Sequence, residues 1–115
     1  MCGIYGITER NKKLIENIIQ KCSHRGPDGS DILINDNLTL GHNLLSITSK
    51  SAEGKQPWVS KRGNVLIYNG EIFNYNDLIK NYINIFLPKT TCDTELLSWL
   101  FDNFQYEEVI SNIID

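Results

Sequence analysis

The chain has 115 residues, of which 41% are hydrophobic and 22% charged, with a net charge of −3. This composition is typical of one soluble globular domain. The net charge is negative, so it gives no positive potential that would attract nucleic acid or anionic membranes. No apolar run is long enough to cross a bilayer, and the N-terminal residues lack the apolar block of a signal peptide. We therefore expect a cytoplasmic protein with neither a nucleic-acid nor a membrane partner.

The first half of the chain predicts a strand, a helix, a loop and two further strands. Residues 2–8 form an apolar run with β-branched side chains, and residues 11–24 repeat their apolar side chains at helical spacing. The stretch HRGPDGS at 24–30 predicts a loop because it contains two glycines and a proline. Residues 31–35 and 37–42 then predict two strands around a turn.

The second half predicts one strand and then helices. Residues 64–69, NVLIYN, read as a strand, and Asn74 or Asn76 can cap the helix that follows. Residues 91–104 predict a clearer helix, and residues 106–115 predict either another helix or the end of that one. Strands that precede helices, without strict alternation, predict an α+β fold with a thin sheet.

The three cysteines (Cys2, Cys22 and Cys92) are widely and unequally spaced. No CxxC pair or Cys/His cluster predicts a zinc site, and a reducing compartment disfavours disulfides. No glycine-rich phosphate loop is present, so the sequence predicts neither a metal nor a nucleotide cofactor.

Each candidate motif has a purely structural interpretation. Cys2 can be a small residue that opens a strand, and HRGPDGS a simple turn. Asn69-Gly70 is the strongest two-residue hairpin signal, and CDTE at 92–95 suits a helix N-terminus because acidic side chains interact well with the helix dipole.

Together the motifs resemble a family. MCGIYGI at the N-terminus, HRGPDGS at 24–30, GHNLLSI at 41–47, QP at 56–57, YNGEIFNY at 68–75 and CDTELL at 92–97 follow the order and spacing of class II glutamine amidotransferases. The chain is most similar to the amidotransferase domain of glutamine-hydrolysing asparagine synthetases. The resemblance covers essentially all 115 residues and implies an Ntn-hydrolase-like α/β/β/α sandwich.

The resemblance implies a catalytic role for Cys2 and L-glutamine as the substrate. In the family, the N-terminal cysteine exposed by loss of the initiator methionine attacks the glutamine amide, forms a thioester and releases ammonia. Its own α-amine has an ordinary pKa of about 7.7–8.0 and can act as the general base. His24 and His42 are therefore not required as partners of the thiol.

The same resemblance implies the remaining site residues. Asn69 and Gly70 match the family's oxyanion donors, and a glycine lets the backbone approach substrate closely. Asp93 matches the aspartate that binds the glutamine α-amino group, Glu71 lies in the same motif as Asn69, and Arg25 borders the pocket. Leu44 stands where family members usually carry an arginine for the α-carboxylate, and leucine makes no ion pair.

The Leu44 departure leaves three interpretations: weak glutamine binding, replacement by another cation such as Arg25 or Lys50, or lost hydrolysis. We favour retained chemistry because Cys2, Asn69 and Gly70 are present. A second departure is length, since family domains continue with further strands and synthetases add an ATP-using domain. The resemblance thus predicts that residues 1–115 are an incomplete N-terminal part of the domain, truncated at its C-terminus and supplying ammonia to a synthetase domain or subunit in trans. The alternatives are an inactive remnant that acts as a binding module, and an unrelated structural domain.

Overall fold

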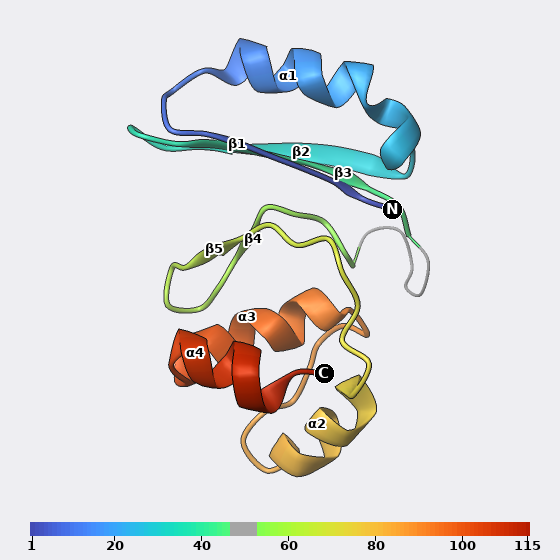
Figure 1. Ribbon diagram of the computed structural model, residues 1–115, viewed down its shortest axis with the longest axis vertical. Helices are drawn as coiled ribbons and strands as arrows, with labels where there is room; N and C mark the ends of the chain where they lie inside the picture. The colour runs from blue at the N-terminus through green and yellow to red at the C-terminus, as the bar shows by residue number, and fades with distance from the viewer. Residues whose placement is uncertain (47–52) are drawn as a thin grey trace.

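The computed structural model arranges the chain in four layers, helix, sheet, sheet and helix (Figure 1), and describes residues 1–46 and 53–115. The layers form two halves that follow each other along the chain. The molecule extends 42 × 29 × 23 Å, and the layers are stacked along its longest dimension. The predicted α+β fold and its α/β/β/α arrangement are confirmed.

The first half is a three-stranded antiparallel sheet in the order β1-β3-β2, formed by β1 (Gly3–Ile7), β2 (Gly29–Ile34) and β3 (Thr39–Leu44). All three predicted strands are confirmed, and the β2–β3 turn closes with Asn35 N–H donating to Leu38 O at 2.9 Å. Gly3 at the start of β1 pairs with Asn43 near the end of β3. This register places Cys2 beside the residues that follow β3.

The predicted amphipathic helix is confirmed as α1 (Lys12–Lys21), which covers the outer face of this sheet (Figure 1). The Asn11 side chain caps it by accepting a hydrogen bond from Leu14 N at 3.1 Å. Ile15 is only 1% exposed, and a Cβ added to Gly41 of β3 would lie 2.4 Å from its Cγ2. A glycine in the central strand therefore lets the helix approach the sheet closely. The short 3₁₀ turn η1 (Ser23–Arg25) follows.

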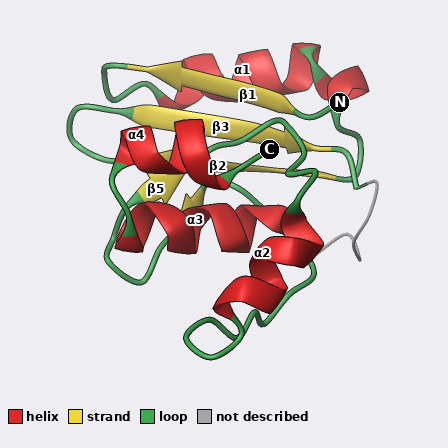
Figure 2. Ribbon diagram, turned by 60° about the horizontal axis from the view of Figure 1, so that its bottom comes forward, coloured by secondary structure: helices red, strands yellow, loops and turns green. Residues whose placement is uncertain are grey.

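The second half combines a small hairpin with helices (Figure 2). Its elements are β4 (Trp58–Val59), β5 (Val65–Leu66), α2 (Tyr75–Tyr82), α3 (Asp93–Asn103), α4 (Tyr106–Glu108) and the π-helical turn η2 (Val109–Ile113). A buried apolar cluster fills this half: Ile72, Leu78, Phe86, Leu96, Leu97, Leu100 and Val109. The aromatic rings of Tyr82, Phe86, Trp99 and Phe104 pack beside it, with centroids 4.8–5.9 Å apart. The predicted helix at 91–104 is confirmed.

Two predictions for the second half need correction. The strand predicted over residues 64–69 pairs only at Val65 and Leu66, so the prediction is wrong beyond Leu66. The strong hairpin signal Asn69-Gly70 lies outside any hairpin, and β4 and β5 are instead joined by a turn in which Gly63 has a φ of 85°. β4 was not predicted. Asn74 is the residue before α2, as expected, but its amide donates to Ile113 O at 2.8 Å instead of capping the helix.

Within residues 1–46 and 53–115, no helix is both long and apolar enough to cross a membrane. The same residues contain no group of three or more His, Cys, Asp or Glu side chains arranged to hold a metal ion.

Candidate functional site

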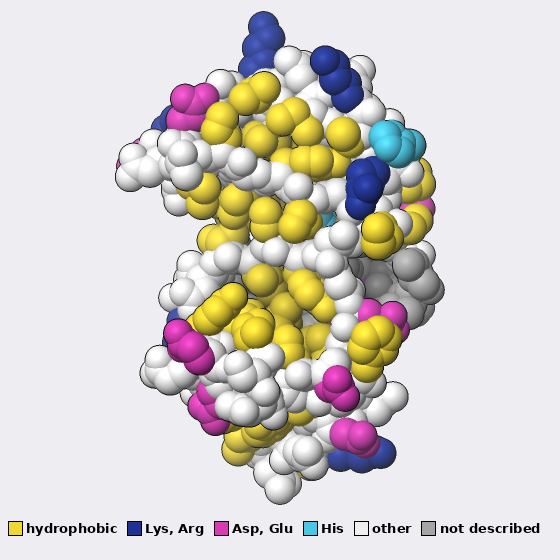
Figure 3. Space-filling view, in the orientation of Figure 1, with side chains coloured by type: hydrophobic (Ala, Val, Ile, Leu, Met, Phe, Trp, Pro, Cys, Tyr) yellow, Lys and Arg dark blue, Asp and Glu magenta, His cyan; other side chains and the backbone are white. Residues whose placement is uncertain are grey.

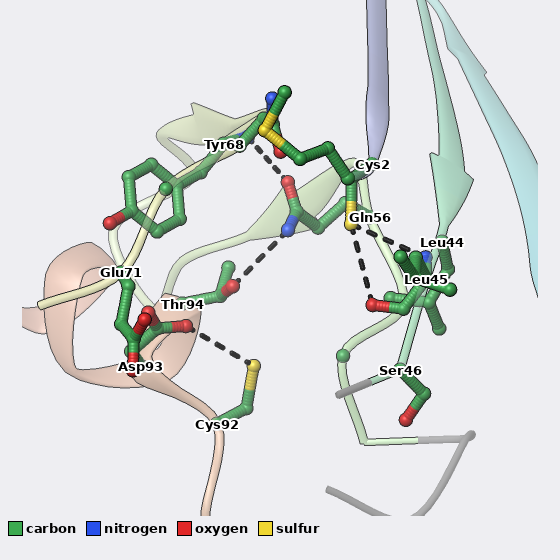
Figure 4. Close-up of a pocket in the computed structure, with 14 residues that line it drawn as sticks. Cys2, Leu44, Leu45, Ser46, Gln56, Tyr68, Glu71, Cys92, Asp93 and Thr94 are labelled. Carbon is green, nitrogen blue, oxygen red and sulfur yellow. Dashed lines mark hydrogen bonds between the residues drawn. The ribbon is translucent and has the colours of Figure 1, made fainter. Parts of the chain in front are cut away.

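A pocket of about 310 Å³ lies where the two halves of the molecule meet. Figure 4 shows its lining side chains converging from both halves. The first half contributes Met1, Cys2, Leu44, Leu45 and Ser46; the second contributes Gly54, Gln56, Tyr68, Asn69, Gly70, Glu71, Cys92, Asp93 and Thr94. Six of the seven predicted site residues therefore line one cavity, although they are separated by up to 91 positions in the sequence.

Cys2 lies at the start of the first strand, with its thiol on the pocket wall. Its Sγ accepts a hydrogen bond from Leu45 N at 3.3 Å and lies 3.6 Å from Leu45 O (Figure 4). The amide N–H can donate to the sulfur whether or not it carries a proton, and the carbonyl can accept from the protonated thiol. The site can therefore hold the sulfur in one position in both protonation states.

Arg25 is the one predicted site residue that does not line the pocket. Its Nε and Nη2 each donate to the Cys2 carbonyl at 3.4 Å. Arg25 therefore fixes the backbone of the cysteine from outside the cavity.

The segment at 26–29 forms hydrogen bonds with the end of β3, which lies beside the Cys2 thiol. Asp28 N donates to Leu44 O at 3.0 Å, and the Asp28 carboxylate accepts from Ser46 N at 2.7 Å. A Cβ at Gly26 would lie 2.5 Å from the carbonyl carbon and oxygen of Asn43, so only glycine permits this approach. The loop thus positions Leu44 and Leu45 beside Cys2.

Asn69, Gly70 and Glu71 line the pocket from exposed, irregular backbone, after β5 has ended. A Cβ at Gly70 would lie 2.7–2.8 Å from the hydroxyl and ring atoms of Tyr68. The glycine thus makes room for the Tyr68 ring, a structural requirement that the sequence did not indicate.

Gln56 joins three segments around the pocket. Its side-chain amide donates to Thr94 Oγ1 at 3.2 Å, and its carbonyl oxygen accepts from Tyr68 N (Figure 4). Gln56 and Thr94 are both buried. The sequence placed Gln56 in a family block without a role, because no local pattern reveals partners 12 and 38 positions away.

Asp93 and Glu71 lie near each other at one end of the pocket (Figure 4). Burial raises the pKa of the Asp93 carboxyl, hydrogen bonds with the backbone of Ile72 and Thr94 counter it, and the Glu71 charge adds to the increase. Burial and the same two carboxylates raise the pKa of Tyr68 to about 12. The end of the pocket is therefore an anionic environment that favours a cationic ligand.

Among the described residues, the wall formed by Leu44 and Leu45 carries no charged side chain, and Leu44 is 6% exposed. Cys92 lies beside Asp93 (Figure 4), and burial raises the pKa of its thiol. Among the described lining residues, Glu71 and Asp93 carry the only charged side chains. Lys50, suggested above as a substitute cation, lies outside the described residues.

His42 connects the halves without lining the pocket. The residue is 1% exposed, and its ring lies near the Tyr68 backbone. Burial lowers the pKa of the ring, so it is neutral near pH 7. Its place between the sheets supports a structural role and no proton transfer with Cys2.

Comparison with known proteins agrees with this geometry. A family model described as a glutamine amidotransferase domain matches residues 1–113. The chain is 32% identical over 93% of its length to a putative glutamine-hydrolysing asparagine synthetase of Methanocaldococcus jannaschii, covering 25% of that protein. It is 33% identical over 88% of its length to asparagine synthetase B of Escherichia coli, covering 19% of that protein. The chain thus spans a quarter or less of the length of these curated relatives, and it belongs to the glutamine amidotransferase domain family.

Proposed function

We propose that the protein hydrolyses the side-chain amide of L-glutamine to glutamate and ammonia, with Cys2 as the nucleophile. The observation that carries the proposal is the convergence of Cys2, Asn69, Gly70 and Asp93 on one pocket of about 310 Å³. These residues supply the three functions that acyl transfer requires, namely attack, oxyanion stabilisation and substrate orientation.

In the proposed reaction, removal of Met1 frees the α-amine of Cys2 at the pocket. The neutral amine accepts the thiol proton, and Sγ adds to the amide carbon of the substrate. The carbon–nitrogen bond then breaks, ammonia leaves with a proton, and a thioester remains. Water hydrolyses the thioester and restores the thiol. The Leu45 N–H, 3.3 Å from Sγ, stabilises the thiolate that attacks.

The second half of the molecule supplies the substrate contacts in this mechanism. The Asn69 side chain and the Gly70 N–H donate to the oxyanion, and losing one such donor typically costs about 10²–10³ in rate. Asp93 pairs with the substrate ammonium, assisted by Glu71. Burial raises the pKa of Asp93, so a cation bound beside it offsets part of the desolvation cost of its charged form.

The proposal extends to the setting of the reaction. We infer that residues 1–115 form the N-terminal part of an amidotransferase domain and act in the cytoplasm. The ammonia would pass to an asparagine-synthetase-like domain or subunit, because the relatives are named as glutamine-hydrolysing asparagine synthetases. The thiol and amine of Cys2 perform the proposed hydrolysis without a cofactor.

A second candidate function is a binding module that retains the pocket without turnover. Leu44 favours it, because this buried hydrocarbon side chain cannot pair with the substrate's carboxylate.

Covalent labelling distinguishes the two functions. The protein, with Met1 removal verified by intact mass, is treated with a diazoketone analogue of glutamine. We expect one adduct on Cys2 that excess glutamine prevents, together with ammonia release that Cys2→Ala abolishes. Cys22→Ala is the matched control and retains both. An unlabelled, folded Cys2, or an adduct confined to Cys92, would instead support the binding module.

A further inference from the structure

The side-chain amide of Gln56 forms two hydrogen bonds in the interior beside the pocket. Nε2 donates to Thr94 Oγ1 at 3.2 Å, and Oε1 accepts from Tyr68 N (Figure 4). Gln56 is 4% exposed and Thr94 is 1% exposed, so water has little access to either side chain. A buried polar group that loses its partner destabilises its surroundings, so both hydrogen bonds hold the amide in one place.

The partners of the amide also determine its orientation. The Tyr68 N–H can only donate, so the side-chain oxygen of Gln56 must face it and the NH₂ group must face Thr94. A flipped amide would place two donors opposite each other at Tyr68. The amide therefore has one arrangement in which both of these contacts are satisfied.

The contact with Tyr68 fixes backbone that no strand holds. β5 ends at Leu66, and residues 67–71 belong to no helix or strand. Asn69 and Gly70 directly follow Tyr68, so the hydrogen bond from Tyr68 N to Gln56 lies immediately before both proposed oxyanion donors.

The contact with Thr94 ties the amide to a regular element. Thr94 directly follows Asp93 in the first turn of α3, the helix whose buried leucines pack in the apolar cluster. Through Gln56, the irregular segment is therefore held against a helix start that packing already fixes.

We infer that Gln56 is a positioning residue for the proposed reaction, and that its amide holds Asn69 and Gly70 where the oxyanion forms. The inference rests on the proposed function of the pocket, but it concerns a residue that acts through others. Displacing a reacting or stabilising group by about 1 Å can lower a rate by about 100-fold. Oxyanion donors act mainly in the transition state, so the loss falls on kcat more than on KM.

Gln56→Met tests the inference because it keeps an unbranched side chain of similar length and removes both hydrogen-bonding groups. On Met1-processed, folded protein, we expect kcat for L-glutamine hydrolysis to fall about 10- to 100-fold and KM to change by less than about threefold. Gln20→Met, on an exposed position of α1, is the matched control and should keep both constants. A wild-type kcat for folded Gln56→Met would overturn the inference.

A double-mutant cycle with Asn69→Ala separates positioning from a general loss of stability. If Gln56 acts through Asn69, Gln56→Met should lower kcat at least about threefold less in the Asn69→Ala protein than in the wild type, because the donor that it positions is already absent. Equal decreases in both proteins would mean that Gln56 does not act through Asn69.

Two substitutions of Thr94 test the other end of the contact. Thr94→Ser keeps the hydroxyl and should keep kcat within about twofold, whereas the isosteric Thr94→Val removes the acceptor and should lower kcat about 3- to 10-fold. If Gln56→Met does not fold, this pair decides the question, and equal kcat values for the two Thr94 variants overturn the inference.

Amide NMR tests the positioning without turnover. In Gln56→Met, hydrogen exchange of the Tyr68 N–H should become at least about tenfold faster, and the amide signals of Asn69 and Gly70 should shift. If these changes occur but the wild type releases no ammonia from L-glutamine, the positioning is correct and the proposed hydrolysis is wrong. If the wild type releases ammonia and the Tyr68 exchange rate is unchanged in folded Gln56→Met, the hydrolysis is correct and the positioning is wrong.

Discussion

The two halves of the molecule contribute to the pocket in different ways. The first half holds Cys2 on a regular sheet, where each strand is paired along its length. The second half presents Asn69, Gly70 and Asp93 from irregular backbone and a helix start, supported by an apolar cluster beneath them. The nucleophile thus depends on hydrogen-bonded pairing, whereas the proposed substrate contacts depend on side-chain packing.

The interiors of the two halves also differ in polarity. The apolar cluster of buried residues belongs to the second half, whereas the buried residues of β3 include the polar side chains Thr39, His42 and Asn43. The space-filling view shows a surface that is hollowed between the halves (Figure 3). A destabilising substitution in one half should therefore destabilise the elements of that half more than those of the other half.

The largest expected effect is on the packing of the second half. Leu100 of α3 is 0% exposed, so Leu100→Ala should lower the free energy of unfolding by about 2–5 kcal/mol. We expect amides of α2 and α3 to lose hydrogen-exchange protection before those of β1 and β3. Urea denaturation and exchange measure both effects. Leu87→Ala, at a position 82% exposed, is the control and should change stability by less than about 0.5 kcal/mol. Equal loss of protection in both halves would show that they unfold as one unit.

The contrast between the two halves also explains which elements could be predicted from the sequence. The first three strands, α1 and α3 are confirmed because short apolar runs indicate the strands and the helical spacing of apolar residues indicates the helices. The strand at 64–69 was predicted too long because Tyr68 N donates to the Gln56 side chain instead of to a neighbouring strand. The backbone leaves the sheet through a partner 12 positions away, and no local pattern encodes that contact.

In the candidate site, too, residues in local motifs could be predicted, whereas contacts between distant residues could not. Its chemical groups, Cys2, Asn69, Gly70 and Asp93, were predicted from ordered motifs, and the structure brings them to one pocket. Their supports were not predicted: Gln56 pairs with Thr94 across 38 positions, and Arg25 reaches the Cys2 carbonyl across 23. Such contacts are determined by tertiary packing, so a single sequence shows the side chains but not the pairs that they form.

A smaller effect is expected where the loop at 26–29 meets β3. Gly26→Ala places a Cβ about 2.5 Å from backbone atoms of Asn43, which cannot move as easily as a flexible side chain. We expect a loss of about 1–3 kcal/mol in stability and slower labelling of Cys2, because the loop holds the segment facing the thiol. Gly29→Ala is the matched control, since its Cβ would meet no atom within 4 Å. If both variants label at the wild-type rate, the loop does not position the nucleophile.

The smallest effect concerns the hairpin of the second half and depends on pH. Buried Asp102 accepts hydrogen bonds from Ser60 Oγ and Asn64 Nδ2, each at 2.8 Å, and from Arg62 N at 3.3 Å. Burial alone would raise the pKa of the Asp102 carboxyl, but the hydrogen bonds from Ser60, Asn64 and Arg62 outweigh it, so the pKa is lowered from 3.8. Asp102→Asn replaces one acceptor oxygen with a donor and should cost about 1 kcal/mol at pH 7.

The direction of the pH dependence follows from the lowered pKa. A carboxyl that ionises more readily in the folded protein stabilises it above the unfolded value of 3.8, and this stabilisation is lost as pH falls through the lower folded pKa. The stability difference between wild type and Asp102→Asn should therefore be full at neutral pH and shrink in acid, as measured by urea unfolding at a series of pH values. Asp36→Asn is the control, because its side chain is 96% exposed and its ion pair with Arg10 spans 3.7 Å. A difference that stays constant down to acidic pH would mean that packing, and not the Asp102 charge, anchors the hairpin to α3.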